Sequence, residues 1–161
     1  MRTAGLAVAA AIALSSLGCG ATTGATTSGA TASAVTLTTA TVTFMTRDDG
    51  KDEDSAIAVQ LLDDEGRLSA EGTVVDVDFD DRTVSQPLTL NISRSLTRRD
   101  VDDARIRLRL TPDGRDAWMF DMRANVRLSD GTEQQYFWSG LRLDESSPER
   151  TLTLASGRTQ Q

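Results

Sequence analysis

The 161-residue sequence contains no histidine, one cysteine (Cys19) and one lysine (Lys51). The lack of histidine excludes Ser-His-Asp and Cys-His triads and removes the commonest zinc ligand. A single cysteine cannot form an internal disulfide, and nothing around Lys51 suggests the burial that would activate it as a base. Only chemistry that runs on two carboxylates, such as glycoside hydrolysis, stays open. We therefore expect that the protein is not an enzyme.

Basic residues are also scarce, with 17 lysines and arginines against 24 acidic residues and a net charge of −7. Residues 1–18 hold one basic residue (Arg2) and no acid, so the chain that follows them has a net charge of −8. Nucleic-acid binders need a basic footprint, and anionic lipid head groups attract polybasic segments. The sequence offers neither, and we expect no nucleic-acid partner.

The N-terminus, "MRTAGLAVAAAIALSSLG" (1–18), has one positive charge followed by an apolar run. The run is shorter than the roughly 20 residues of a membrane-spanning helix and is typical of an export signal peptide. Leu17, Gly18 and Cys19 resemble the lipobox of bacterial lipoproteins. That resemblance implies cleavage before Cys19, acylation of its thiol with palmitate-like chains, and a membrane-anchored protein of the cell envelope. The alternative is an ordinary signal peptide followed by an incidental cysteine.

Residues 20–34 consist only of glycine, alanine, threonine and serine. Such a segment buries too little apolar area to fold, so we expect a flexible tether with a root-mean-square reach of about 20 Å. The predicted organisation is a signal peptide (1–18), a lipidated cysteine with its tether (19–34), one folded domain (35–156) and a disordered tail (157–161).

From residue 35 onward, apolar and polar residues alternate. This period of two is typical of strands with one buried face, and Gly/Asp/Pro-rich turns separate the segments. We expect a short helix within 96–104 and an all-β fold, an antiparallel eight-stranded β-sandwich. The eight expected strands are 35–46, 55–62, 72–80, 87–93, 104–110, 117–128, 133–143 and 150–154.

The turn "TPDG" (111–114) suggests that the strands on either side of it form a hairpin. Matching their apolar faces predicts Leu110 opposite Trp118, and Arg107 opposite Asp121 on the solvent side. The arginines of the first strand could form an anion site. We favour a solvated face with cross-strand pairs.

Two stretches, 41–66 and 104–128, together resemble the PLAT domain, the sandwich shared by polycystin, lipoxygenase and alpha-toxin proteins. The second contains Asp116, Trp118 and Asp121 in that family's Asp-x-Trp-x-x-Asp spacing. The resemblance implies two four-stranded sheets in an accessory module that binds lipid surfaces or protein partners. It also implies that acidic loops bind calcium in some members.

The loop "RDDGKDED" (47–54) is the candidate metal site. Calcium takes six to eight oxygen ligands on a flexible scaffold, which an Asp/Gly loop can supply. The alternative is a solvated hairpin tip. The candidate ligands are Asp48, Asp49, Asp52 and Asp54, with Asp80 and Asp81 of a second loop completing the site if the fold brings the loops together.

The segment "QYFWSG" (135–140) is the candidate binding surface. If Phe137 faces the core together with Leu141 and Leu143, Tyr136 and Trp138 point outward and suit a sugar ring, a lipid interface or a protein. If instead Gly140 marks a bulge, the alternation shifts and both rings are buried.

These observations predict an exported, lipid-anchored envelope protein whose sandwich is a non-catalytic binding or interaction module. The more specific version of this hypothesis is that calcium assists the binding. The expected partners are the membrane, through the anchor at Cys19, and a protein, lipid-surface or glycan ligand. One alternative is a ligand-free structural scaffold of the envelope. A more distant one is a small carboxylate-dependent hydrolase.

Overall fold

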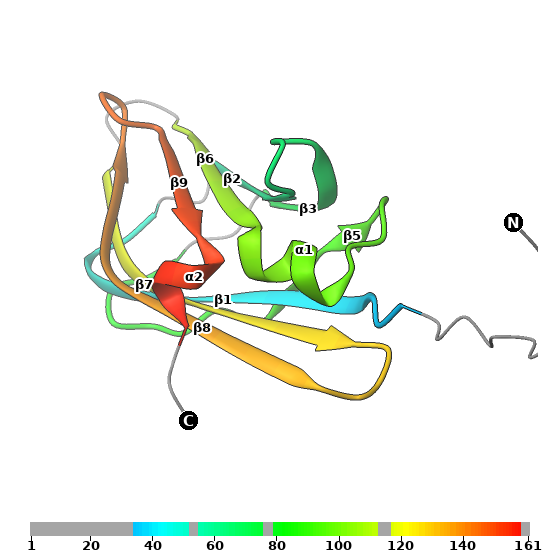
Figure 1. Cartoon of the computed structure of the whole chain (residues 1–161). Coiled ribbons are helices and arrows are strands. Elements are labelled where there is room, and N and C mark those ends of the chain that lie inside the picture. The colour runs from blue at the N-terminus through cyan, green and yellow to red at the C-terminus, as the bar shows by residue number, and fades with distance from the viewer. Residues whose placement is uncertain (1–33, 52–54, 76–78, 113–116, 159–161) are drawn as a thin grey trace, which may run out of the picture. The chain divides into compact units, whose positions relative to one another are not determined.

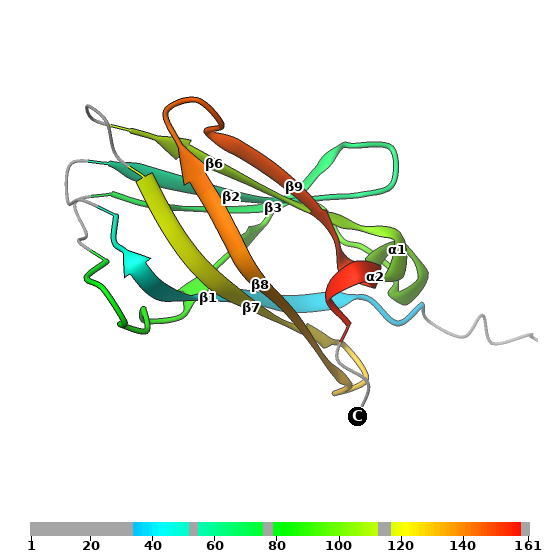
Figure 2. The same ribbon diagram turned by 90° about the vertical axis from the view of Figure 1, so that its left-hand side faces the viewer.

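The computed structural model describes residues 34–51, 55–75, 79–112 and 117–158. They belong to one compact unit, Ser33–Gln161. Two antiparallel sheets pack face to face and enclose the apolar core, so the predicted all-β sandwich is confirmed (Figures 1 and 2). Among these residues no helix is long and apolar enough to cross a membrane.

The four-stranded sheet has the order β4-β1-β7-β8, and the five-stranded sheet has the order β5-β3-β2-β6-β9. Two short helices lie near one end of the sandwich (Figure 2). In chain order the elements are β1 (Leu37–Asp49), β2 (Ala56–Leu62), β3 (Leu68–Val74), β4 (Leu88–Thr89), β5 (Asn91–Ile92), α1 (Arg98–Asp103), β6 (Arg105–Thr111), β7 (Ala117–Leu128), β8 (Glu133–Asp144), β9 (Glu149–Thr153) and α2 (Leu154–Gly157).

The extra strand arises because the segment expected as one strand, 87–93, crosses between the sheets. Its β4 part pairs with β1, and its β5 part pairs with β3. Leu90, between the two parts, is buried and donates its backbone N–H to the carbonyl of Ala40 over 2.9 Å. The sandwich is thus joined along this side by one continuous segment.

The third strand lies earlier in the sequence than expected, at 68–74 instead of 72–80. Val75, which lies within the expected strand, is 52% exposed, whereas Phe79 is buried. At Gly72 a Cβ would come within 3.0 Å of Leu90, so the small residue leaves room for the crossing segment. The inward residues in the middle of β3, Ala70 and Gly72, are therefore too small to mark a strand in the sequence.

The predicted hairpin of 104–110 with 117–128 is wrong. β6 pairs with β2 and β9, while β7 pairs with β1 and β8 in the other sheet. Leu110 lies opposite Ile57, and Trp118 lies opposite Leu143. Alternation in a sequence tells which face of a strand is buried, but it does not tell which strands pair. Two consecutive strands bury their apolar faces equally well as a hairpin in one sheet or as members of two facing sheets.

The arginines of β6 lie on the outer face of the five-stranded sheet. Arg107 donates to the side-chain oxygen of Gln60, with Nε at 2.9 Å. Asp121, its predicted partner, instead accepts from Arg47 on β1. The expected cross-strand pairing on a solvated face is present, but with different partners from those predicted.

An aromatic cluster fills one end of the core, where Trp118 packs against Phe44, Phe79 and Phe120. Lys51 is fully buried beside it, with Nζ 5.5 Å from the centre of the Phe79 ring. No local sequence pattern around Lys51 indicates this burial. It follows from the paired backbones of Lys51 and Phe79, which exchange N–H···O bonds of 3.2 and 2.9 Å and draw the lysine inward.

The predicted short helix is present as α1, which begins with a capping box between Thr97 and Asp100. The predicted disordered tail begins too early. Gly157, at the end of α2, is buried, and Arg158 forms a backbone bridge with Tyr136 and an ion pair with Asp102. These contacts fix the chain at least as far as residue 158.

Candidate functional site

A β-bulge in β8 decides which aromatic side chains reach the surface. Met122 lies opposite Trp138 but Phe120 lies opposite Leu141, so β8 has one extra residue between these pairs. Gly140 takes up the extra residue with a φ of 64°, a conformation that suits glycine. Even-numbered residues face the core before the bulge, and odd-numbered residues face it afterwards.

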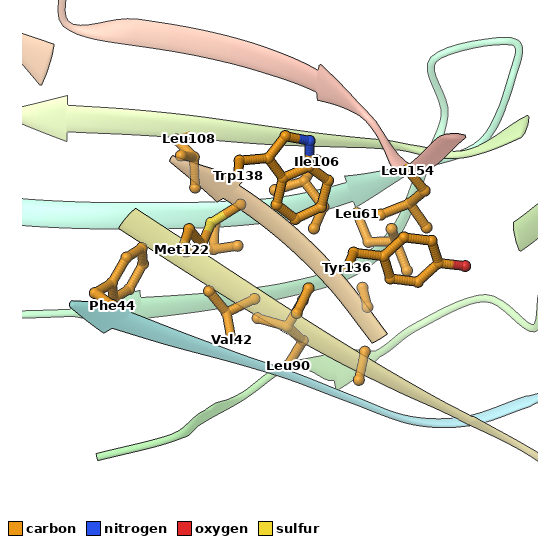
Figure 3. Packing of buried hydrophobic residues seen from close by; sticks show 14 of the residues in the cluster. Val42, Phe44, Leu61, Leu90, Ile106, Leu108, Met122, Tyr136, Trp138 and Leu154 are labelled. Atoms are coloured by element: carbon orange, nitrogen blue, oxygen red, sulfur yellow. The ribbon is translucent and has the colours of Figure 1, made fainter. Parts of the chain in front are cut away.

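The predicted binding surface at Tyr136 and Trp138 is therefore wrong, and the alternative of a bulge is confirmed. Tyr136 is 1% exposed and Trp138 is 7% exposed. Both rings point from β8 into the space between the sheets, toward Leu154 and Ile106 (Figure 3). The Tyr136 hydroxyl donates to Gln134, and the Trp138 indole donates to the Ser156 hydroxyl over 3.1 Å.

Phe137, predicted to be a core residue, points outward instead and is 37% exposed. It lies on the outer face of the four-stranded sheet, in a surface that we call the sheet platform. The register places its side chains in three rows that cross β1, β7 and β8. The rows are Thr43–Arg123–Phe137, Thr41–Asn125–Gln135 and Thr39–Arg127–Glu133.

Two shallow hollows lie on the sheet platform. One, of about 320 Å³, extends from Thr39 and Thr41 to Gln135, and the other, of about 270 Å³, lies between Arg123 and Phe137. Gln135 lines both, so the hollows are adjacent. Neighbouring strands are about 4.8 Å apart and successive rows about 7 Å apart, so the platform measures roughly 10 by 14 Å.

The sheet platform carries one uncompensated positive charge. Three arginines of this outer face have a carboxylate partner: Arg47 with Asp121, Arg127 with Glu133 and Arg142 with Asp144. Arg123 is exposed, and its side chain has neither an ion pair nor a hydrogen bond among residues 34–51, 55–75, 79–112 and 117–158. Its guanidinium is thus available to an anionic group from outside the chain.

Asn125, at the centre of the sheet platform, retains an unsatisfied polar atom. Its side-chain oxygen is buried and accepts no hydrogen bond within the described part of the chain. A buried acceptor without a partner costs roughly 1–3 kcal/mol of stability. Such groups call for an explanation, and one explanation is that the site serves a purpose other than stability.

The acidic loop lies at the end of the sandwich where β1 stops. The fold brings its described part beside the second acidic loop, since an ideal Cβ on Gly50 would lie 3.3 Å from a carboxylate oxygen of Asp81. Asp48 is exposed and accepts two hydrogen bonds from Arg82, at 3.0 and 2.9 Å. The side chain of Asp49 and residues 52–54 lie outside the described residues.

The described carboxylates do not by themselves form a calcium site. No group of three metal-binding side chains occurs among them, and Asp48 is already paired with a guanidinium. A calcium ion would need six to eight oxygens. The calcium hypothesis therefore depends on Asp49, Asp52 and Asp54, and it stays a prediction.

Among the acidic residues that the structure describes, three have perturbed acidity, and in each the pKa is lowered. Hydrogen bonds from Ser146 and Arg142 lower the pKa of Asp144 from 3.8 to about 2. Burial raises the pKa of Asp63, but bonds from Arg67 and the charge of Arg94 outweigh it and leave a net lowering. Bonds from Thr132 lower the pKa of Asp130. A general acid needs the opposite shift, so these groups are suited to structure.

The sheet platform was not found from the sequence. Its residues are spread over three strands and are of types that commonly face solvent. Two signals were present: Gly140 inside a strand, and the change of apolar phase from even-numbered residues at 136 and 138 to odd-numbered residues at 141 and 143. Together they mark a bulge and place Phe137 outside.

No protein-family model matches this sequence, and no curated protein sequence matches it. The resemblance to the PLAT domain therefore stays a prediction. Of the three residues that carry its spacing, Trp118 is a core residue, Asp121 binds Arg47, and Asp116 lies outside the described residues.

Proposed function

We propose that this protein is an exported lipoprotein of the bacterial cell envelope, anchored through Cys19, whose sandwich is a non-catalytic binding module. The sheet platform is its binding surface. One observation carries the assignment: an exposed aromatic ring, Phe137, lies directly opposite the uncompensated guanidinium of Arg123 on an open face. A ligand-free scaffold has no need of either group.

The geometry of the sandwich supports this role. β1 begins beside Leu128 at the end that adjoins the predicted tether, and it ends beside Met119 at the opposite end. The sheet platform runs along the first half of β1, from Thr39 to Thr43. Its side chains lie on the face of the sheet that points away from the core, so a ligand can reach them from solvent.

The anchor is tested by replacing the cysteine in the full-length precursor. Wild type should incorporate labelled palmitate and fractionate with membranes. Cys19→Ser should not incorporate the label and should not form the acylated, membrane-embedded protein. Equal labelling of both proteins would overturn the lipoprotein assignment, and absence of label from both would favour the ordinary signal peptide.

The binding surface is tested by co-sedimentation of the mature chain carrying Cys19→Ser with delipidated bacterial envelopes. A platform variant, Phe137→Asp, should lose retention. The matched control Thr73→Asp adds the same charge at an exposed position of β3, on the other sheet, and should be retained like wild type. Equal retention of all three proteins, or of none, would favour the scaffold alternative.

A further inference from the structure

The chemistry of the sheet platform narrows the ligand class, on the condition that the proposed function holds. The row Thr43–Arg123–Phe137 places a hydroxyl, a guanidinium and an aromatic ring side by side on three adjacent strands. The next row, Thr41–Asn125–Gln135, adds a hydroxyl and two amides about 7 Å away. A ligand that matches these rows needs an anionic group, an apolar face and several hydroxyls within a few ångströms of one another.

The anionic group follows from charge complementarity. The other arginines of this face are neutralised by Asp121, Glu133 and Asp144, so Arg123 gives the platform its net positive charge. The whole chain after residue 18 is strongly negative, so this charge is a local exception. A guanidinium fork binds a carboxylate with two parallel hydrogen bonds.

A protein ligand fits the platform less well. Stable protein interfaces have an apolar centre with several aromatic or aliphatic anchors. Among the described residues of β1, β7 and β8, Phe137 is the only exposed large hydrophobic residue. The surrounding threonines, amides and arginines instead match the closely spaced hydroxyls of a sugar chain, and the ring matches the C–H face of a sugar.

We propose that the sheet platform binds an acidic polysaccharide, with a carboxylated sugar unit over Arg123 and Phe137. The two adjacent hollows, which meet at Gln135, accommodate consecutive units along the sheet. Arg123 binds the carboxylate, Phe137 stacks on the sugar face, and Thr41 and Gln135 bind hydroxyls of the neighbouring unit. The preference for acidic over neutral sugars depends on Arg123.

The test is calorimetry and NMR titration of the mature chain carrying Cys19→Ser with trisaccharides of galacturonate, mannuronate and glucuronate. The methyl esters of the same trisaccharides keep the rings and remove the charge. At least one acid should bind, with its methyl ester weaker by tenfold or more. Arg123→Gln should weaken the acid by tenfold or more, and shifted amide signals should map to β7 and β8.

The matched control is Arg109→Gln. Arg109 is an exposed strand arginine on the opposite sheet and likewise has no ion pair among the described residues. The Arg109→Gln variant should bind the acidic trisaccharide like wild type. The proposal is overturned if no acidic trisaccharide binds, or if both arginine variants behave alike. If envelopes retain the chain in a manner that depends on Phe137 while no trisaccharide binds, the proposed binding module is supported and the proposed acidic-sugar ligand is overturned. If neither binds, both proposals fail.

Discussion

The ring of Trp138 occupies the space where a side chain on residue 157 would begin. An ideal Cβ on Gly157 would lie 2.3 Å from Cε2 and 2.5 Å from Cζ2 of Trp138, far inside van der Waals contact. The indole also donates to the hydroxyl of Ser156 on the same helix. Trp138 and Gly157 thus fix α2 against β8 and close one side of the sandwich.

Gly157→Ala should therefore destabilise the domain, by about 2–3 kcal/mol, because the rigid indole cannot move aside without losing its packing. Urea denaturation of the mature chain measures the change. Ala155→Ser, on the exposed side of the same helix, should have little effect. Adding Trp138→Phe to Gly157→Ala should recover part of the loss, since the smaller ring vacates the space. If the glycine variant is as stable as the Ala155→Ser control, the contact does not hold the helix.

The sequence predicted most of the sandwich because its strands are amphipathic. In β2 large apolar residues alternate with alanine or glutamine, and in β7 apolar residues alternate mostly with polar ones; the structure places both strands close to the expected bounds. Pairing was not predictable in the same way. Leu110 and Trp118 are both core residues, but they lie in different sheets, and no local signal distinguishes a hairpin from a crossing between sheets.

The prediction of the binding surface failed because a single residue shifted the alternation of buried and exposed side chains. Because of the bulge at Gly140, Phe137 is exposed and its two aromatic neighbours are buried, the reverse of the predicted binding surface. Lys51 was missed because its burial depends on pairing with Phe79, which is distant in the sequence. Both are tertiary effects acting on residues whose types commonly occur on either side of a sheet.

Asp144 should contribute to acid sensitivity. Its folded-state pKa of about 2 lies below the ordinary 3.8, so its stabilising effect is fully present above about pH 4 and is lost as the pH falls toward 2. Asp144→Asn should be less stable at pH 7 and lose less stability than wild type between pH 4 and pH 2. Urea midpoints across this range measure the slope. The control Glu145→Gln removes a charge from the same turn and should keep the wild-type slope, whereas parallel curves for Asp144→Asn and wild type would contradict the assignment.

The calcium hypothesis predicts a change in thermal stability. If the acidic loop binds the ion, millimolar calcium should raise the melting temperature by several degrees relative to EDTA, by preferential binding to the folded chain. Asp48→Asn should reduce the shift. Arg82→Gln should enlarge it, because the guanidinium of Arg82 competes for the Asp48 carboxylate. Magnesium serves as the control ion. Unchanged melting temperatures in wild type and in Arg82→Gln would identify 47–54 as a solvated loop.

Lys51 should report opening of the domain, because it is the chain's only lysine and is fully buried. An acylating reagent modifies a lysine only when the amine is exposed, so labelling at Lys51 should be at least tenfold slower than at a surface lysine and should accelerate in urea. Arg99→Lys provides that surface lysine on α1, where the side chain is exposed. Peptide mass spectrometry separates the two positions and the N-terminal amine. Equal labelling of both lysines in native buffer would show that the end of the sandwich around Phe79 is open, and would contradict the burial of Lys51. Slow labelling that follows global unfolding in urea would instead show that this end of the core opens only with the whole domain.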